Sequence, residues 1–334
     1  MRKKLTVAEP PKTSHQFLAL PLSIIFTNEK DILNWYYSNF IQIYTARFHD
    51  ENVIVRLYDN EDQNDYEPLQ NVKISGSRLQ VGDEIIEMYK RFIDNEYYIY
   101  TFCDDAYIST MNIIVHRMHD ILIHGYDDET ENFNVYAYNG PKLVEFNVSY
   151  EDFIKAYESD FTRDYGHLTV LYKKKNQEFN INIEKIKWHL LDYYEGVNTL
   201  KRERPYGAAH YKAQWGIKIY DELIHLCDLR IQKNRNIGMA EIYCFYEHKK
   251  NMVNRVRYLN EHTPLKCTES ILKLFEETEK SAKRFANFIN KIKMKGYNTQ
   301  DFEKIEQRIK HVEELDKEAL SRYIEYNKEE FKRI

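Results

Sequence analysis

A chain of 334 residues and 40.4 kDa is larger than most single domains, so two domains are expected. Hydrophobic residues make up 43% of the sequence and charged residues 30%, a composition that excludes a mainly disordered chain. The 48 basic and 53 acidic side chains leave a net charge of −5, which indicates no nucleic-acid partner. The longest apolar stretch near the N-terminus, residues 17–26, is too short to span a membrane and contains Pro21.

The N-terminal segment and the cysteines both favour a cytoplasmic protein. Residues 1–4 are basic, but Pro10, Pro11 and a polar segment follow where the hydrophobic part of a signal peptide would begin. The four cysteines lie far apart, without the Cys-x-x-Cys spacing of a zinc site and without a disulfide framework: Cys103, Cys227, Cys244 and Cys267. We therefore expect reduced thiols, no bound metal and no membrane attachment.

In chain order, the first hundred residues alternate between helical and extended patterns. Apolar residues spaced three and four apart predict helices at residues 31–45 and 83–93, the first of them capped by Asn28 or Asp31. Residues 53–58 and 96–103 are rich in β-branched and aromatic side chains and predict strands.

The strongest strand pattern begins at His119. It runs to Asp127, resumes at Phe133 after a turn at residues 127–132, and turns again at Asn139 and Gly140. The sequence therefore predicts two consecutive antiparallel hairpins. Residues 149–152 then resemble a capping box and predict a short helix to about residue 158.

Beyond about residue 178 the strand alternation disappears. Helical spacing dominates residues 182–196, 208–227, 238–260, 268–295 and 299–332, with turn-forming residues between these segments. We expect an α+β domain over residues 10–177 and an α-helical domain over residues 178–334. Within the helix at 238–260, the charged run from Glu247 to Lys250 is expected to form a solvated face.

Several segments resemble the butirosin biosynthesis protein H family. In the first part they are HDILIHGYD from His119 to Asp127, FNVYAYNG at residues 133–140 and VSYEDF at residues 148–153. In the second part, QWGIKIYDEL at residues 214–223 and FYEHKKNMVNRVRYL at residues 245–259 are also similar to that family, so the resemblance spans residues 17–260. Members of this family look like double-glycine cysteine peptidases converted to acyltransferases of thiotemplated, nonribosomal-peptide-type antibiotic pathways.

The resemblance implies a papain-like N-terminal domain, in which a helix packs on an antiparallel sheet. It also implies acyl transfer or amide formation: a thiolate takes the acyl group from the thioester of an acyl or peptidyl carrier protein, and an amine acceptor attacks the acyl-enzyme. The cofactor would be the phosphopantetheine arm of the carrier protein, with none bound by this chain. His119 matches the catalytic base, and Asn139 lies near the position of the orienting aspartate.

The nucleophile does not match the family pattern. That pattern places a cysteine at the start of the first helix, near residues 28–33, where the helix dipole and a protonated His favour the thiolate. No cysteine precedes Cys103 in this sequence. Three explanations remain open. Cys103 is the nucleophile, although it ends an apolar strand beside two aspartates, or His119 activates an amine directly, or the site is non-catalytic and binds a carrier protein or an acyl chain.

Two further assignments use the same residues. A catalytically inactive binding or scaffold protein of such a pathway is the main alternative to the acyltransferase, because the expected cysteine and aspartate are both missing. A cysteine peptidase that cleaves leader peptides needs the same missing thiol. His116 and His119 have a local spacing compatible with metal binding, but the sequence supplies no third ligand at a recognised spacing.

Overall fold

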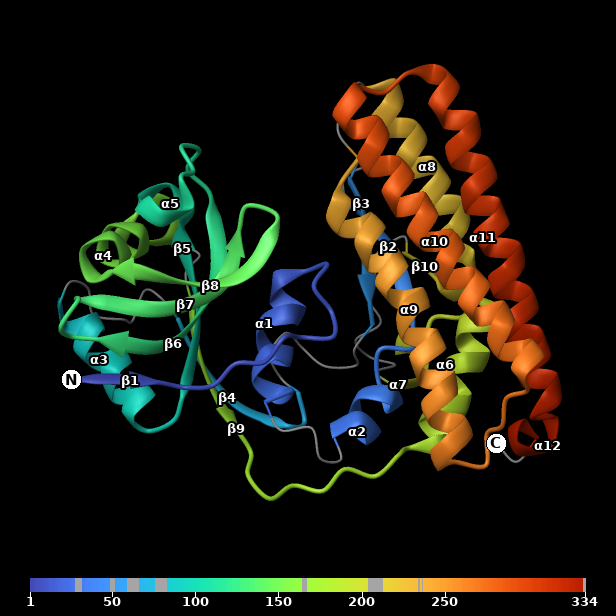
Figure 1. Cartoon of the computed structure of the whole chain (residues 1–334), viewed down its shortest axis with the longest axis horizontal. Helices are drawn as coiled ribbons and strands as arrows, with labels where there is room; N and C mark the ends of the chain where they lie inside the picture. Colours follow the sequence, from blue (N-terminus) through green and yellow to red (C-terminus); the bar gives the residue numbers. More distant parts are fainter. Residues whose placement is uncertain are drawn as a thin grey trace. The chain divides into compact units, whose positions relative to one another are not determined.

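The computed structural model describes residues 1–27, 32–48, 52–58, 66–75, 83–163, 167–203, 213–233, 235 and 237–332 (Figure 1). Its contacts divide the chain into two units. Met1–Ile32 and Glu61–Glu178 form the first unit, and Leu33–Asn60 and Phe179–Ile334 form the second. One division thus falls next to the expected boundary at residue 178. The segment Leu33–Asn60 differs from the expectation, because it packs with the helical unit.

The first unit is built on an antiparallel sheet. Its strands follow the order β4, β9, β5, β6, β7, β8, and β1 pairs with the end of β6. The strands are β1 (Arg2–Lys4), β4 (Leu69–Ser75), β5 (Tyr98–Asp104), β6 (Met118–Asp127), β7 (Asn132–Asn139), β8 (Lys142–Ser149) and β9 (His167–Lys173). The two predicted hairpins are confirmed, since β6, β7 and β8 pair in sequence order.

Helices lie on both faces of this sheet (Figure 1). On one face, α3 (Asp83–Asp94) and α4 (Tyr150–Glu158) contribute Tyr89 and Phe153 to a core shared with the strands. Each such buried side chain stabilises the fold by about 1.5–3 kcal/mol. On the other face lies α1 (Gln16–Ile25), which contacts β6, β7 and β9. The remaining short helices are η2 (Asp105–Tyr107), η3 (Ser109–Met111) and α5 (Asp160–Arg163).

Two local features of the first part differ from the sequence prediction. α1 was not predicted, because nine of its ten residues are buried and the helix has no polar face to produce a periodic pattern. The helix predicted at residues 31–45 is wrong in length. α2 (Ile32–Ser38) is followed by Phe40 with a φ of 55°, and β2 (Ile43–Phe48) takes the rest. The predicted caps Asn28 and Asp31 lie outside the described residues.

The second unit combines a small antiparallel sheet with long helices. The sheet has the order β10 (Ala213–Trp215), β2, β3 (Asn52–Leu57). The helix predicted at residues 208–227 is confirmed only from Ile219 onward, because a strand and a short 3-10 helix occupy residues 213–218. The helices are α6 (Ile183–Glu195), α7 (Leu200–Glu203), η4 (Gly216–Lys218), α8 (Ile219–Gln232), α9 (Met239–His262), α10 (Glu269–Lys295), α11 (Thr299–Tyr326) and α12 (Lys328–Phe331). The predicted α+β class with a helical C-terminal region is confirmed. In the part of the chain that the structure describes, no helix combines the length and the hydrophobicity of a membrane span.

The charged run on α9 is not a solvated face, and that prediction is wrong. His248 is fully buried and hydrogen-bonds the Ile41 carbonyl at 2.8 Å through Nε2. Lys249 Nζ lies 2.7 Å from Asp316 Oδ2, and neither side chain is more than 1% exposed. Tyr193 and Tyr220 also donate hydrogen bonds to that carboxylate oxygen. His248 and Lys249 therefore make polar contacts inside the helical unit, and only Lys250 at the end of the run is exposed.

Candidate functional site

His119 stands near the start of β6, where it is paired with Cys103 of β5 in the strand register. Its side chain is 29% exposed, and its Nδ1 atom lies 3.7 Å from Asp105 Oδ2. The same Nδ1 atom lies 3.5 Å from Nε2 of Gln16. Nε2 of His119 has no hydrogen-bond partner within the described part of the chain. We call Gln16, Asp105, His119 and Asp120 the His119 cluster.

Gln16 is the first residue of α1, and its amide is inserted between β6 and β7. Its Oε1 accepts a hydrogen bond of 2.6 Å from the Tyr138 backbone N–H. Its Nε2 donates to the Asp120 carbonyl and, at 3.2 Å, to Asp120 Oδ1. The pairing of β6 with β7 stops at Leu122 and Tyr136, immediately before this point. The Gln16 amide therefore supplies the hydrogen bonds that a backbone ladder would otherwise make.

Two carboxylates flank His119. Burial raises the pKa of Asp120, while the neighbouring His119 and hydrogen bonds from Tyr100 and Gln16 act in the opposite direction. The Tyr100 hydroxyl donates to Asp120 Oδ2 at 2.8 Å. The buried Asp105 accepts from Arg117 Nε at 2.8 Å through Oδ2, and its Oδ1 atom has no hydrogen-bond partner. The His119 imidazole thus lies beside Asp105 and Asp120, and Oδ1 of Asp105 has no hydrogen-bond partner.

Cys103 lies inside the hydrophobic core of the first unit. Its side chain is fully buried among residues such as Tyr89 and Ile121. Burial raises the pKa of the thiol well above its usual value, and the carboxylates of Asp105 and Asp120 raise it further. A buried thiol of this kind is held protonated and is a poor nucleophile. Cys103 is also the only cysteine in the sequence of this unit.

Asn139, the last residue of β7, has a different partner from the one expected. Its Nδ2 atom donates to the Thr110 carbonyl at 3.1 Å. In the described structure it makes no hydrogen bond to His119. The structure therefore brings Gln16, Asp105 and Asp120 to His119, and it does not bring Asn139 there.

A second histidine has the orientation of a base. His116 Nδ1 lies 2.8 Å from Oδ2 of the buried Asp104, which also accepts a 2.6 Å hydrogen bond from Ser159. Burial alone would raise the pKa of Asp104, but the hydrogen bonds from Ser159 and His116 outweigh it and lower the pKa. The ring of His116 stacks on Phe161 with centroids 5.6 Å apart. The residues that the structure describes contain no group of three or more His, Cys, Asp or Glu side chains able to hold a metal ion.

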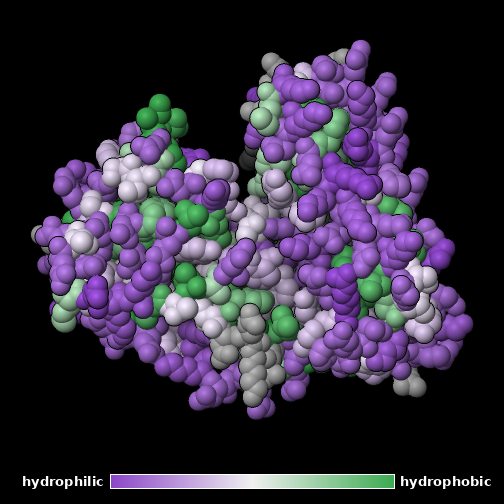
Figure 2. All heavy atoms as spheres, viewed as in Figure 1, coloured by the Kyte–Doolittle hydropathy of each residue, from purple (hydrophilic) through white to green (hydrophobic). Residues whose placement is uncertain are grey.

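The loop between η3 and β6 is hydrophobic at its surface. Ile114 is 92% exposed and Val115 is 66% exposed. Figure 2 shows this loop as a hydrophobic tip that projects from the first unit. Exposed apolar side chains gathered in one place are typical of surfaces that contact another molecule. The loop leads directly into His119 along the chain.

Gln16 is the residue of this site that the sequence analysis missed. A polar residue directly before an apolar segment marks the start of a helix, and residues 13–16 followed by 17–26 carry that signal. Its contact with β6, more than a hundred residues away, has no local signature.

In sequence, the chain matches no protein-family model and no curated protein.

Proposed function

We propose that this chain is a catalytically inactive, papain-like binding protein of a carrier-protein-dependent biosynthetic pathway. The observation that carries the proposal is the position of Gln16. It is the first residue of α1, and its Nε2 atom lies 3.5 Å from Nδ1 of His119. A helix start beside the base is where an acyltransferase of this type needs its thiol, so the position of the missing nucleophile is residue 16 and not the expected residues 28–33. A carboxamide is not a nucleophile.

The hydrogen bonds of Gln16 support a binding role further. The amide is hydrogen-bonded to both β6 and β7, so it bridges the two strands beside His119 and fixes the surroundings of the imidazole. Cys103 offers no substitute, because its thiol is buried and its pKa is raised by that burial. The resemblance of the HDILIHGYD segment supplies the partner class, an acyl or peptidyl carrier protein with its phosphopantetheine arm.

The exposed loop before β6 is the proposed contact surface for the carrier protein. Ile114 and Val115 are largely exposed, and burying both would contribute about 3–6 kcal/mol. The variant Ile114→Asp/Val115→Asp should weaken carrier-protein binding at least tenfold by calorimetry. Val72→Asp is the matched control, since Val72 is 53% exposed on β4 at the far edge of the sheet. Equal losses in both variants would contradict the loop assignment.

A restored nucleophile tests the central claim. Wild-type protein incubated with acyl-loaded carrier protein should bind it and show no covalent adduct by intact-mass spectrometry. Gln16→Cys should become acylated at residue 16, and the rate should fall when His119→Ala is added to Gln16→Cys. Acylation of the wild-type protein, or no binding of carrier protein by any form, would overturn the proposal.

A second candidate is direct acid–base catalysis of acyl transfer to an amine, without an acyl-enzyme. It is favoured by the pairing of the partly exposed His119 with Asp105 at 3.7 Å. In that case the wild-type protein would release amide product over many turnovers with no adduct, and His119→Ala would abolish the release. Equal product with and without the protein rules this candidate out.

A further inference from the structure

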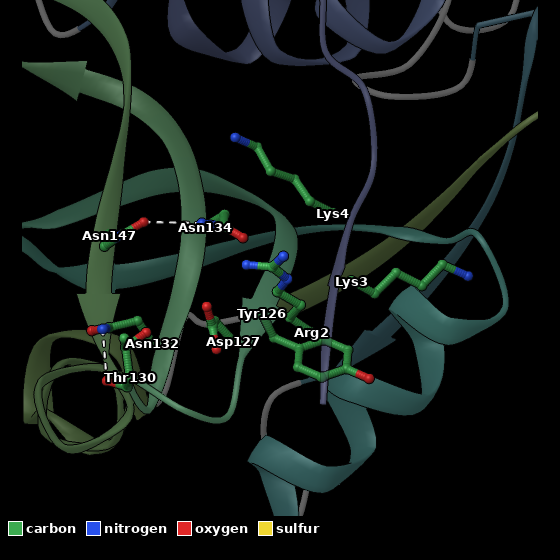
Figure 3. Close-up of a pocket in the computed structure, with 9 residues that line it drawn as sticks. All are labelled: Arg2, Lys3, Lys4, Tyr126, Asp127, Thr130, Asn132, Asn134 and Asn147. Carbon is green, nitrogen blue, oxygen red and sulfur yellow. Dashed lines mark hydrogen bonds between the residues drawn. The ribbon is translucent and has the colours of Figure 1, made fainter.

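A polar pocket of about 410 Å³ lies at the end of β6 that is remote from His119 (Figure 3). β1 forms one side of it, and the ends of β6, β7 and β8 form the rest. His119 and Asp127 are eight residues apart on the same strand, which places the two sites about 26 Å from each other. The pocket is therefore independent of the function proposed above.

Two rows of paired residues cross this end of the sheet, the first over four strands and the second over three. The first row pairs Lys4 with Gly125, Gly125 with Asn134, and Asn134 with Asn147. The second pairs Arg2 with Asp127, and Asp127 with Asn132. Directly paired residues on antiparallel strands project from the same face. In Figure 3, Arg2 and Lys4 extend to the side of β1 where Asn134 and Asn147 lie, while Lys3 points to the opposite side.

The pocket depends on the absence of a side chain at Gly125. It is buried, and a Cβ atom at this position would lie 2.5 Å from Asn134 Oδ1 and 2.9 Å from the Lys3 carbonyl. Any other residue would therefore push into the space between β1 and β7. The register shift in β6 between Ile123 and Gly125 accompanies this close approach.

Most of the hydrogen-bonding groups in the pocket that have no protein partner are donors. The Arg2 guanidinium has no ion-pair or hydrogen-bond partner within the described structure, and its five N–H donors are available. Asn147 accepts a 2.9 Å hydrogen bond from Asn134 through Oδ1, which leaves the Asn147 NH₂ group free to donate. Lys4 pairs with Glu145, but both side chains are more than a third exposed, so this pair is weak.

One acidic group faces the same space. Asp127 Oδ1 accepts from the Glu129 backbone N–H at 2.9 Å, and no cation lies within ion-pair distance of its carboxylate among the described residues. Arg2 and Asp127 are paired in the strand register, yet they form no ion pair with each other. A ligand can therefore meet an unpaired cation and an unpaired carboxylate side by side.

We infer that this pocket binds a small organic anion, a carboxylate or a phosphate, that also carries a hydroxyl or ammonium group. The anionic group would accept hydrogen bonds from the Arg2 guanidinium, a geometry that planar guanidinium favours. Asn147 would donate to the same group. The hydroxyl or ammonium group would donate to Asp127.

Titration of ¹⁵N-labelled full-length protein tests the inference. L-Lactate and glycerol 3-phosphate are the probes, and glycerol is the uncharged comparison. We expect saturable shifts of the side-chain amides of Asn132, Asn134 and Asn147 with one of the two anions and none with glycerol. The anion that saturates identifies the ligand as a carboxylate or a phosphate. Absence of saturation with both anions would overturn the inference.

Two variants with matched controls complete the test. Arg2→Gln removes the guanidinium charge, and Asn147→Asp adds a negative charge while keeping the acceptor for Asn134. Each should weaken anion binding at least tenfold. Lys73→Gln and Gln70→Glu make the same charge changes at exposed positions of β4, the opposite edge of the sheet, and should change affinity less than twofold. Unchanged affinity in Arg2→Gln would contradict the inference.

Discussion

Replacing Gln16 with methionine should separate β6 from β7 at the His119 cluster. Methionine keeps the length of the side chain and removes the amide. The Tyr138 N–H and the Asp120 carbonyl then lose their partner in a region where Gln16 itself is only 6% exposed. An unpaired buried polar group costs about 1–3 kcal/mol, so two of them lower the free energy of unfolding by about 2–6 kcal/mol.

The measurement must report on the first unit alone. All three tryptophans, Trp35, Trp188 and Trp215, belong to the second unit, so tryptophan fluorescence does not follow this change. Backbone amide hydrogen exchange at Tyr138 does follow it. A loss of 2 kcal/mol corresponds to about 30-fold faster exchange, which sets the smallest expected effect. Urea unfolding followed by circular dichroism gives the change for the whole unit.

A matched control is available on the same sheet. Gln70→Met changes an exposed glutamine of β4 and should alter the free energy of unfolding by less than about 0.5 kcal/mol. If the Tyr138 amide in Gln16→Met exchanged at the wild-type rate, the Gln16 amide would not hold the two strands, and the structural role assigned to it would be refuted.

Three other outcomes are expected. Native Cys103 should react with a thiol reagent at pH 7 at least 100-fold more slowly than after unfolding, and rapid native labelling would contradict its burial. Burial lowers the pKa of His124 below its usual value of 6.5, so the unfolded chain binds the proton first and stability is lost as the pH falls below about 6.5. His124→Asn keeps a donor for the Leu5 carbonyl and should reduce the dependence of the free energy of unfolding on pH, measured by urea titrations from pH 5 to 7. For one titrating group this dependence is at most about 1.4 kcal/mol per pH unit. If it were unchanged in the variant, groups other than His124 would be responsible. Asp316→Asn leaves Lys249 buried without a counter-charge and should cost about 3–5 kcal/mol by tryptophan fluorescence. Lys249→Met/Asp316→Asn removes the buried charge and keeps an amide oxygen as acceptor for Tyr193 and Tyr220, so it should recover most of that loss.

Hairpins and capped helices were predictable because their signals are local. The turn at Asn139 and Gly140 joins β7 to β8 as the sequence indicated, with Gly140 at a φ of 63°. Ser149 Oγ accepts from the Asp152 N–H at 3.1 Å and caps α4, again as expected. The Asp152 carboxylate, however, accepts from the Ser109 N–H, a partner 43 residues away that no local pattern contains.

Prediction from hydrophobic periodicity failed where an element is buried on all sides, because periodicity depends on a difference between apolar and polar faces. α1 is apolar on every side, so no pattern distinguished it from a strand or a short apolar run. The charged run at 247–250 was predicted to be solvated because charge usually faces water, but Asp316 and Tyr193 from distant parts of the chain bind the buried Lys249.

For this chain, alternation, turn residues and caps were sufficient to establish an antiparallel sheet with helices and a helical second half, and the position of His119 at the start of a strand. Only the tertiary structure determined which side chains contact the His119 imidazole. Hydrogen bonds and burial join residues without regard to their separation in sequence, so the amide of Gln16 and the carboxylate of Asp105 came to His119 while Cys103 and Asn139 were directed elsewhere.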